Sequence, residues 1–183
     1  MEQMTERLIL RNFSRKDLDD LYEYSQNPNV GPNAGWEPHP TKAHSRRVLR
    51  EQFLSNKHVF GIVLKETGKL VGSVGLAEDR KRMNPRAMML GYALGEPYWG
   101  RGYMTEAAEA VLGYGFGKLA LKIISAYCYP FNARSRHVME KLGLTYEGTI
   151  RQSDVLYDGR VLDNQCFSIT REEYYGRKAE LEI

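Results

Sequence analysis

Residues 96–111 read EPYWGRGYMTEAAEAV, and they place two glycines around an arginine just before an alanine-rich run. Gly100 and Gly102 let the backbone take conformations that a side chain would obstruct. The apolar residues beyond them recur at helical spacing, which predicts one buried stripe on a helix from Thr105 to about Leu119. The unpaired amides of about Arg101–Thr105 can therefore donate together to one anion at a helix N-terminus.

Two other glycine-rich turns do not fit this stretch. The dinucleotide fingerprint needs a third glycine where this chain has Thr105, and the phosphate loop of nucleoside triphosphatases needs a Gly-Lys-Ser/Thr ending that is absent. What remains is a strand, a glycine turn and a helix start. An anion site and a plain structural turn share that pattern, so the rest of the chain has to distinguish them.

Composition limits the class of protein. The chain has 183 residues, 42% hydrophobic and 27% charged, which suits one domain over residues 1–183. The net charge of +3 is compatible with an anionic ligand, but no basic stripe with interleaved aromatics indicates a nucleic-acid partner. The run Arg80-Lys81-Arg82 is interpreted as a solvated loop. Oligomeric state is left open, a homodimer included.

Cysteine and histidine usage gives no sign of a metal centre. Cys128 and Cys166 lie in apolar stretches, so we expect small buried hydrophobes rather than a disulfide. The four histidines show no ligand spacing, so no metal is predicted. The N-terminus lacks the features of a secretory signal, and no apolar run approaches the ~20 residues that span a bilayer. We therefore expect a cytoplasmic protein with no membrane partner.

The first third of the chain alternates regular elements with one long loop. Ser14 and Asp17 come close to a capping box and mark a helix start. Four prolines and two glycines between residues 27 and 40 make that stretch a loop, and ordered loops of this length are often functional. The expected elements are a strand beginning at Leu8–Leu10, a helix over Arg15–Gln26, and a helix from Thr41 towards Asn56.

The remaining elements complete an α/β fold. Strands are expected at Val59–Lys65, Leu70–Ala77, Ala87–Leu94, Lys122–Tyr129, Thr145–Leu156 and Val161–Thr170, with a short helix over Arg134–Leu142 that ends at Gly143. With the N-terminal strand this gives about seven strands in a mixed, mostly antiparallel central sheet with flanking helices.

A second segment, NARSRHVMEKLGLTYEG at residues 132–148, follows a buried strand with a polar Asn-x-x-Ser at a helix start. The order strand, glycine turn, helix, strand, Asn-x-x-Ser helix and Lys-Leu-Gly-Leu resembles the GNAT superfamily of acyl-CoA-dependent N-acetyltransferases. GYALGEPYWGRGYMTEA, NARSRHVMEKLGL, the GPNAGWEPH loop and DVLYDGRVLDN resemble in particular the ribosomal-protein alanine N-acetyltransferases. The resemblance covers about Arg7–Tyr174.

The resemblance implies a transferase that binds acetyl-CoA as co-substrate. The glycine turn would bind the pyrophosphate through main-chain amides, while the end of the preceding strand and one asparagine side chain would bind the pantetheine arm. Met104 stands where relatives carry a small residue, so the pocket beside it is expected to be tighter. No residue is assigned to the adenine or the ribose phosphate. The implied cofactor residues are Ala93, Leu94, Gly100, Arg101, Gly102, Tyr103, Met104, Thr105 and Asn132.

Acetyl transfer needs a neutral amine, a stabilised oxyanion and a proton for the thiolate. Ser135 matches the position where relatives are proposed to protonate the thiolate, with local backbone capping as the structural alternative. The strand before the glycine turn carries no acid. Asp154 matches a carboxylate proposed as base in the alanine-acetylating branch, and Glu147 or a bound water are its rivals.

The acceptor side is implied by the loop. Trp36, Glu37 and His39 would line the amine site, although Glu37 and His39 could equally fix the loop. The leading hypothesis is acetylation of a primary amine, such as the N-terminus of a ribosomal protein. The alternatives are a small amine (an amino acid, polyamine or aminoglycoside) and a catalytically silent module that binds acyl-CoA.

Overall fold

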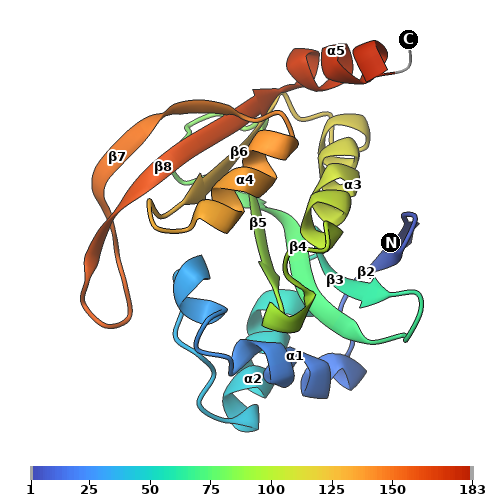
Figure 1. Cartoon of the computed structure of the whole chain (residues 1–183), viewed down its shortest axis with the longest axis vertical. Coiled ribbons are helices and arrows are strands. Elements are labelled where there is room, and N and C mark those ends of the chain that lie inside the picture. Colours follow the sequence, from blue (N-terminus) through green and yellow to red (C-terminus); the bar gives the residue numbers. More distant parts are fainter. Residues whose placement is uncertain (1, 182–183) are drawn as a thin grey trace. The chain divides into compact units, whose positions relative to one another are not determined.

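The computed structural model describes residues 2–181, and the strands in this range form one sheet with the order β1-β2-β3-β4-β5-β6-β8-β7 (Figure 1). The pair β5–β6 is parallel, and β1–β2, β2–β3, β3–β4, β6–β8 and β7–β8 are antiparallel. The strands are β1 (Glu2–Met4), β2 (Leu8–Arg11), β3 (Val59–Leu64), β4 (Leu70–Glu78), β5 (Ala87–Leu94), β6 (Ile123–Cys128), β7 (Thr145–Val155) and β8 (Val161–Thr170). The predicted mixed, mostly antiparallel sheet is confirmed, with the short strand β1 in addition to the expected seven.

Helices and short helical turns connect these strands. None of the helices among residues 2–181 is long and apolar enough to cross a membrane. The helices are α1 (Leu18–Ser25), α2 (Lys42–Val48), α3 (Tyr103–Gly117), α4 (Ala133–Lys141) and α5 (Arg171–Leu181), with shorter turns η1 (Arg15–Asp17), η2 (Gly31–Ala34), η3 (Leu49–Phe53) and η4 (Glu96–Tyr98).

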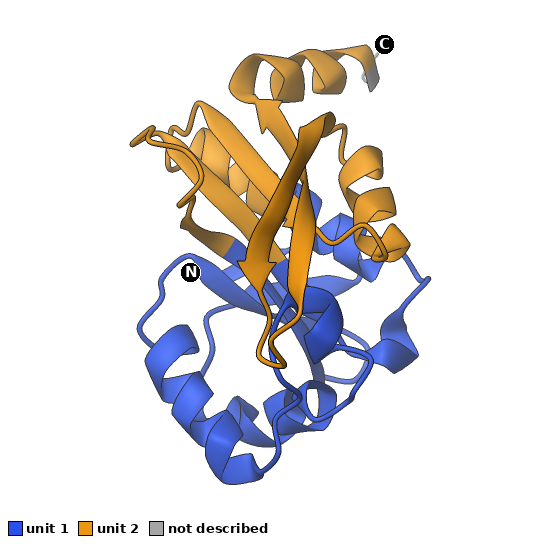
Figure 2. Cartoon of the chain, turned by 90° about the vertical axis from the view of Figure 1, so that its left-hand side faces the viewer, with its two compact units in different colours: residues 1–75, 92–110 blue, residues 76–91, 111–183 orange. Residues whose placement is uncertain are grey.

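The chain divides into two compact units, coloured blue and orange in Figure 2. The first unit contains residues 1–75 and 92–110, and the second contains residues 76–91 and 111–183. Strands β4 and β5 and helix α3 therefore contribute residues to both units.

The first unit begins its helical part with a complete capping box. The Ser14 side chain accepts a hydrogen bond from the amide of Lys16 (3.3 Å), and the Asp17 carboxylate accepts one from the amide of Ser14 (2.7 Å). Arg11 holds the same carboxylate with both terminal nitrogens, at 2.7 and 2.8 Å. Burial alone would raise the pKa of Asp17, but these donors hold that pKa below its ordinary value.

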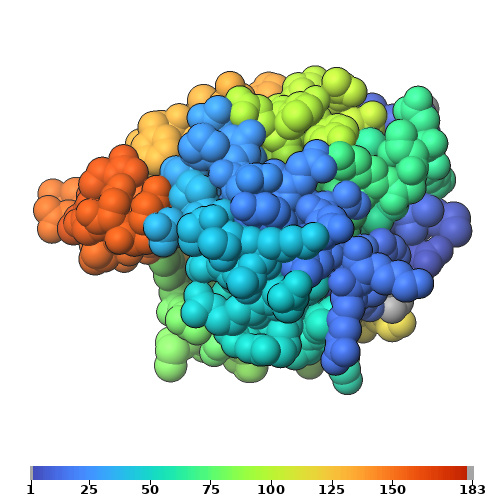
Figure 3. All heavy atoms as spheres, turned by 90° about the horizontal axis from the view of Figure 1, so that it is seen from below, coloured from blue at the N-terminus to red at the C-terminus, as the bar shows by residue number. Residues whose placement is uncertain are grey.

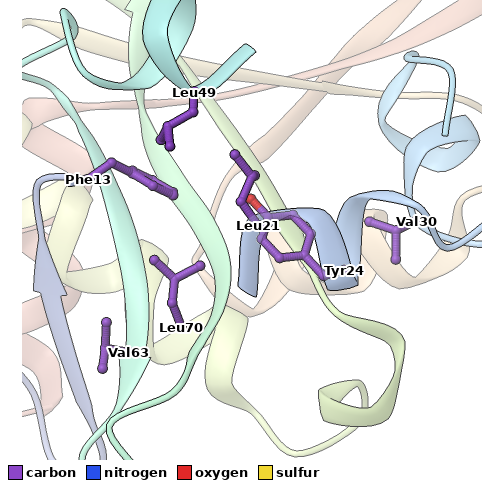
Figure 4. Packing of buried hydrophobic residues seen from close by; sticks show 7 residues of the cluster. All are labelled: Phe13, Leu21, Tyr24, Val30, Leu49, Val63 and Leu70. Carbon is purple, nitrogen blue, oxygen red and sulfur yellow. The ribbon is translucent and has the colours of Figure 1, made fainter. Parts of the chain in front are cut away.

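Behind this cap lies an apolar cluster that joins helices to strands (Figure 4). Phe13 packs against Phe53 with ring centroids 4.4 Å apart and the ring planes tilted by 36°. Because the cluster draws residues from α1, the loop after it, β3 and β4, it fixes the base from which the long loop of residues 27–40 leaves. The buried members are Phe13, Leu21, Tyr24, Val30, Leu49, Val63 and Leu70.

In the second unit, α4 lies across β6, and β7 and β8 form a long hairpin (Figure 1). Gly115 lets α3 lie close to β6, since a Cβ at position 115 would lie 2.7 Å from Ile124 Cδ1. Phe116 and Tyr174 bring the end of α3 against α5, with ring centroids 5.0 Å apart. Cys128 and Cys166 are free and buried, as predicted, and burial raises the pKa of the Cys128 thiol to about 11.

Candidate active site

The glycine turn ahead of α3 has the backbone that its sequence predicts. Gly100 and Gly102 have φ of 74° and 79°, in the left-handed region that favours glycine. The first helical hydrogen bond runs from the amide of Glu106 to the carbonyl of Gly102 (3.0 Å), so the amides just before Glu106 stay outside the helical ladder. A Cβ at Gly100 would meet nothing within 4 Å. The turn is therefore open at Gly100, and a helix start of this kind suits an anion such as the expected pyrophosphate.

Arg7 holds this turn in place together with Thr5 and Glu106. None of these three residues was among the predicted site residues. Arg7 Nη1 donates to the carbonyl of Arg101 (2.9 Å), and the Arg7 guanidinium lies 4.6 Å from the centroid of the Tyr103 ring. Its Nε donates to Glu106 Oε2 (2.7 Å), while the Thr5 hydroxyl donates to Glu106 Oε1 (2.5 Å). Thr5 and Arg7, in the connection between β1 and β2, thus fix the first turn of α3.

The predicted strand end is also held in place. The carbonyl of Leu94 accepts a hydrogen bond from the Trp99 indole nitrogen (2.7 Å), and the amide of Gly95 donates to the carbonyl of Val71 (2.8 Å). Gly72 gives this end room, because a Cβ at Gly72 would lie 2.4 Å from the Ala93 carbonyl oxygen. The backbone of Ala93 and Leu94 is therefore fixed beside β4.

The long loop of residues 27–40 belongs to the blue and cyan surface of Figure 3. Trp36 packs over Gly31, where a Cβ would lie 2.7 Å from an indole carbon. Glu37 is exposed and His39 is buried. His39 Nδ1 lies 2.7 Å from the Ser45 hydroxyl oxygen, and the His39 amide donates to the carbonyl of Ser25 (2.9 Å).

The electrostatics of His39 follow from its position. Burial, followed by nearby His44, lowers the pKa of His39 to about 4. The imidazole is therefore neutral at neutral pH and joins the loop to α2 through Ser45. This geometry gives His39 a part in fixing the loop, while Glu37 presents its carboxylate to solvent.

Asn132 caps α4 in the second unit. Its Oδ1 accepts a hydrogen bond from the amide of Ser135 (3.1 Å), and its own amide donates to the carbonyl of Tyr129 (2.9 Å). An N-cap asparagine held in this way keeps its amide group in one orientation. Ser135 lies in the first turn of α4, three residues after the capping residue, with a half-buried side chain.

Asp154, near the end of β7, contacts four polar side chains. Its Oδ2 accepts from Asn164 Nδ2 (2.6 Å) and lies 3.5 Å from the Tyr129 hydroxyl, while its Oδ1 lies 3.0 Å from the Ser153 hydroxyl and 3.3 Å from Lys81 Nζ. Burial alone would raise the pKa of Asp154, but Asn164 and Lys81 lower it below its ordinary value. Asp154 is therefore ionised at neutral pH.

Glu147, the rival carboxylate, belongs to a neighbouring network of the same unit. It pairs with Arg82 and accepts a hydrogen bond from the Ser168 hydroxyl. Arg82 Nε also donates to the Ser125 hydroxyl (2.6 Å). Buried Asp79 accepts from the Tyr127 hydroxyl at 2.9 Å, and with burial this raises the pKa of Tyr127 to about 12.

The predicted residues therefore fall into two groups, one in each unit. The first unit brings the glycine turn beside Arg7 and Glu106, and it holds the strand end and the long loop of residues 27–40. The second unit holds Asn132, Ser135 and Asp154. The basic run interpreted as a solvated loop lies in a turn with Arg80 and Lys81 exposed, and two of its side chains, Lys81 and Arg82, also pair with carboxylates.

Comparison with known proteins places this geometry in a family. Residues 7–145 match the model of the acetyltransferase (GNAT) domain. The chain is 32% identical over 176 residues to uncharacterized N-acetyltransferase p20 of Bacillus licheniformis, which covers 94% of this chain and 97% of that protein. It is 25% identical over 181 residues to the ribosomal protein uS5-alanine N-acetyltransferase of Escherichia coli, covering 93% of this chain and 91% of that one.

A solved structure agrees with the sequence match. The crystal structure of a GNAT-family acetyltransferase from Bacillus anthracis superposes with a TM-score of 0.84 at 28% identity, covering 94% of this chain and all of that chain. The family match spans both the glycine turn and the Asn132–Ser135 segment, the two motifs on which the resemblance was based. The chain belongs to the GNAT family of N-acetyltransferases.

Proposed function

We propose that residues 1–183 form a single N-acetyltransferase domain that transfers an acetyl group from acetyl-CoA to the N-terminal amine of a protein such as a ribosomal protein. Membership of the GNAT family, whose enzymes use acetyl-CoA, carries the acetyl-transfer part of this proposal. The acceptor part is supported by similarity to an enzyme named for a ribosomal-protein alanine. We further propose a cytoplasmic location.

The proposed cofactor site uses backbone more than side chains. The amides of residues 101–105 would hold the pyrophosphate, which is supported by the open, left-handed turn at Gly100 and Gly102. The strand end at Ala93–Leu94 and the amide group of Asn132 would bind the pantetheine arm. The cap that Asn132 Oδ1 makes to Ser135 supports this role, because it orients the side chain.

In the proposed mechanism, Asp154 receives the proton of the acceptor ammonium, directly or through water, and Ser135 gives a proton to the departing thiolate. The amine nitrogen forms a bond to the acetyl carbon as the bond from that carbon to sulfur breaks, and the second proton that the nitrogen then loses replaces the one that Ser135 gave. The ionised state of Asp154 supports its role, since only a carboxylate can accept the proton. Glu147, held by Arg82, or a bound water remains the alternative base.

On the acceptor side, we propose that Trp36, Glu37 and His39 form one wall of the amine site. Glu37 is the exposed carboxylate of the loop and suits contact with a cationic acceptor. Trp36 and His39 would hold the loop that forms this wall. The packing of Trp36 on Gly31 and the contact of His39 with Ser45 support that role.

A coenzyme A release assay tests the proposal. The panel contains peptides with free N-terminal alanine or serine, free amino acids, spermidine and an aminoglycoside, and each peptide has an N-acetylated copy as control. We expect release with free N-terminal peptides and none with their acetylated copies. Release of coenzyme A with small amines alone would replace the proposed protein acceptor with a small amine. No release with any member of the panel, despite acetyl-CoA binding, would favour a catalytically silent module that binds acyl-CoA.

A further inference from the structure

The turn between β4 and β5 places the ammonium of Lys81 in a small polar site of the second unit. Lys81 Nζ lies 2.7 Å from the Ser153 hydroxyl oxygen and 3.3 Å from Asp154 Oδ1. The same nitrogen lies 4.7 Å from the centroid of the Tyr127 ring. A carboxylate, a hydroxyl and an aromatic face are the groups that together recognise a primary ammonium.

This site keeps its shape without the Lys81 side chain. Asn164 and Ser153 bond the Asp154 carboxylate at 2.6 and 3.0 Å. The turn itself is held by Asp79, whose carboxylate accepts from the amide of Lys81 (2.9 Å) and whose carbonyl accepts from the amide of Arg82 (3.1 Å). The Lys81 ammonium is therefore an occupant of the site rather than part of its frame.

The contact is also weak enough to exchange. The side chains of Lys81 and Asp154 are 28% and 36% exposed. Ion pairs at this exposure contribute little to the stability of the folded chain, because solvent screens the two charges and both side chains must be held in one conformation. A competing ammonium can therefore displace Lys81 at small cost.

We propose that Asp154, Ser153 and Tyr127 form the subsite for the ammonium of the acceptor, and that Lys81 determines specificity by competing for it. The role of this subsite in acetyl transfer rests on the proposed function. Lys81 then favours acceptors with a primary ammonium, because such an acceptor replaces the lost contact between Lys81 and Asp154 with its own. An acceptor without an ammonium makes no such contact and does not offset the loss. In the sequence, Lys81 is only the middle residue of the basic run Arg80-Lys81-Arg82, and nothing in that run predicts that its ammonium lies beside Asp154.

The test measures ammonium binding without any acetyl transfer. n-Butylammonium, with n-butanol as the neutral probe, is titrated into the full chain while backbone amide NMR signals are followed in wild type, Lys81→Met, Lys81→Gln and Arg80→Met. Arg80 is the matched control, an exposed cation in the same turn. We expect both Lys81 variants to bind n-butylammonium about two- to fivefold more tightly than wild type. Arg80→Met should match wild type, and n-butanol binding should not change.

Two outcomes overturn the proposal. Unchanged or weaker n-butylammonium binding in folded Lys81→Met and Lys81→Gln shows that the lysine does not compete. Equal tightening in Arg80→Met shows a general charge effect instead of a subsite. Because the titration needs no acetyl-CoA, tighter binding in the Lys81 variants combined with a silent coenzyme A release assay leaves the ammonium site standing and rejects only the proposed function.

Discussion

Arg7 and Glu106 join the residue just before β2 to the first turn of α3 by two hydrogen bonds, from Arg7 N to Oε1 (2.8 Å) and from Arg7 Nε to Oε2 (2.7 Å). The remaining arm of the guanidinium reaches the carbonyl of Arg101, inside the glycine turn. Arg7 thus holds one peptide of the turn while Glu106 holds Arg7. The amides that we propose for pyrophosphate binding are fixed before any ligand arrives, which lowers the entropic cost of binding.

Arg7→Lys should therefore behave almost like Arg7→Gln, although lysine keeps the charge. A single ammonium cannot hold Glu106 and the Arg101 carbonyl in the fork geometry of a guanidinium. We expect both variants to raise the KM for acetyl-CoA about three- to tenfold with a smaller change in kcat, as a loss of about 1 kcal/mol implies. Wild-type KM in Arg7→Lys beside a raised KM in Arg7→Gln would mean that charge alone matters.

His39 gives the folded chain a distinct pH dependence. Its folded-state pKa of about 4 lies below the ordinary 6.5, so the unfolded chain takes up the proton more readily. The stability that neutral His39 contributes is complete above about pH 6.5 and is lost as pH falls towards 4, by at most about 3 kcal/mol. Urea unfolding at about pH 7, 6 and 5 measures this loss.

The variant His39→Gln should flatten that pH dependence, since its amide can bond Ser45 without titrating. His137→Gln is the matched control, because His137 is exposed on α4. It should keep the wild-type slope. An unchanged slope in His39→Gln would show that another group carries the pH dependence.

Ser135 and Asp154 should respond differently to pH. Ser135→Ala should lower kcat about 10²- to 10⁴-fold while leaving acetyl-CoA binding largely intact, because a proton donor acts after the amine attacks. Asp154→Asn should damage turnover mainly near neutral pH. Alkaline buffer should partly rescue Asp154→Asn, since the amine then loses its proton without help.

Rate profiles from about pH 6 to 10 separate the two variants. Because the pKa of Asp154 is lowered, the wild-type carboxylate stays ionised throughout this range, and the acceptor amine accounts for the remaining dependence. Wild-type turnover of Asp154→Asn at pH 7 would remove Asp154 from the mechanism and favour Glu147 or water. Loss of acetyl-CoA binding in Ser135→Ala would make the serine a cofactor ligand.

Most of the fold could be predicted because its signals are local. Strand β5 begins and ends where its apolar run does, and Gly143 ends α4 with a φ of 76°. Helix α5 was missed although its cap was readable: Thr170 and Glu173 form reciprocal bonds, with Thr170 Oγ1 accepting from the Glu173 amide (3.2 Å). Helix α3 begins at Tyr103, two residues before the predicted start, because no side-chain cap marks its N-terminus in the sequence.

The partners of the site residues were harder to predict, since they depend on long-range pairing. Arg7 and Glu106 are 99 residues apart, and Lys81 and Asp154 are 73 apart. No spacing rule joins such residues. A basic run is usually solvated. The pairing of β7 with β8 is irregular between Ile150 and Asp154, and Asp154 there contacts both Asn164 and Lys81.

The most direct measurement of the central claim is calorimetric titration of acetyl-CoA into wild type, Gly102→Asp and Gly68→Asp. Gly68 has a similar φ of 70° in a hairpin with open space around it, so Gly68→Asp controls for backbone strain and added charge. We predict that wild type and Gly68→Asp bind acetyl-CoA, and that folded Gly102→Asp does not, because its carboxylate would face the pyrophosphate. Wild-type affinity in folded Gly102→Asp would contradict the assignment of the glycine turn.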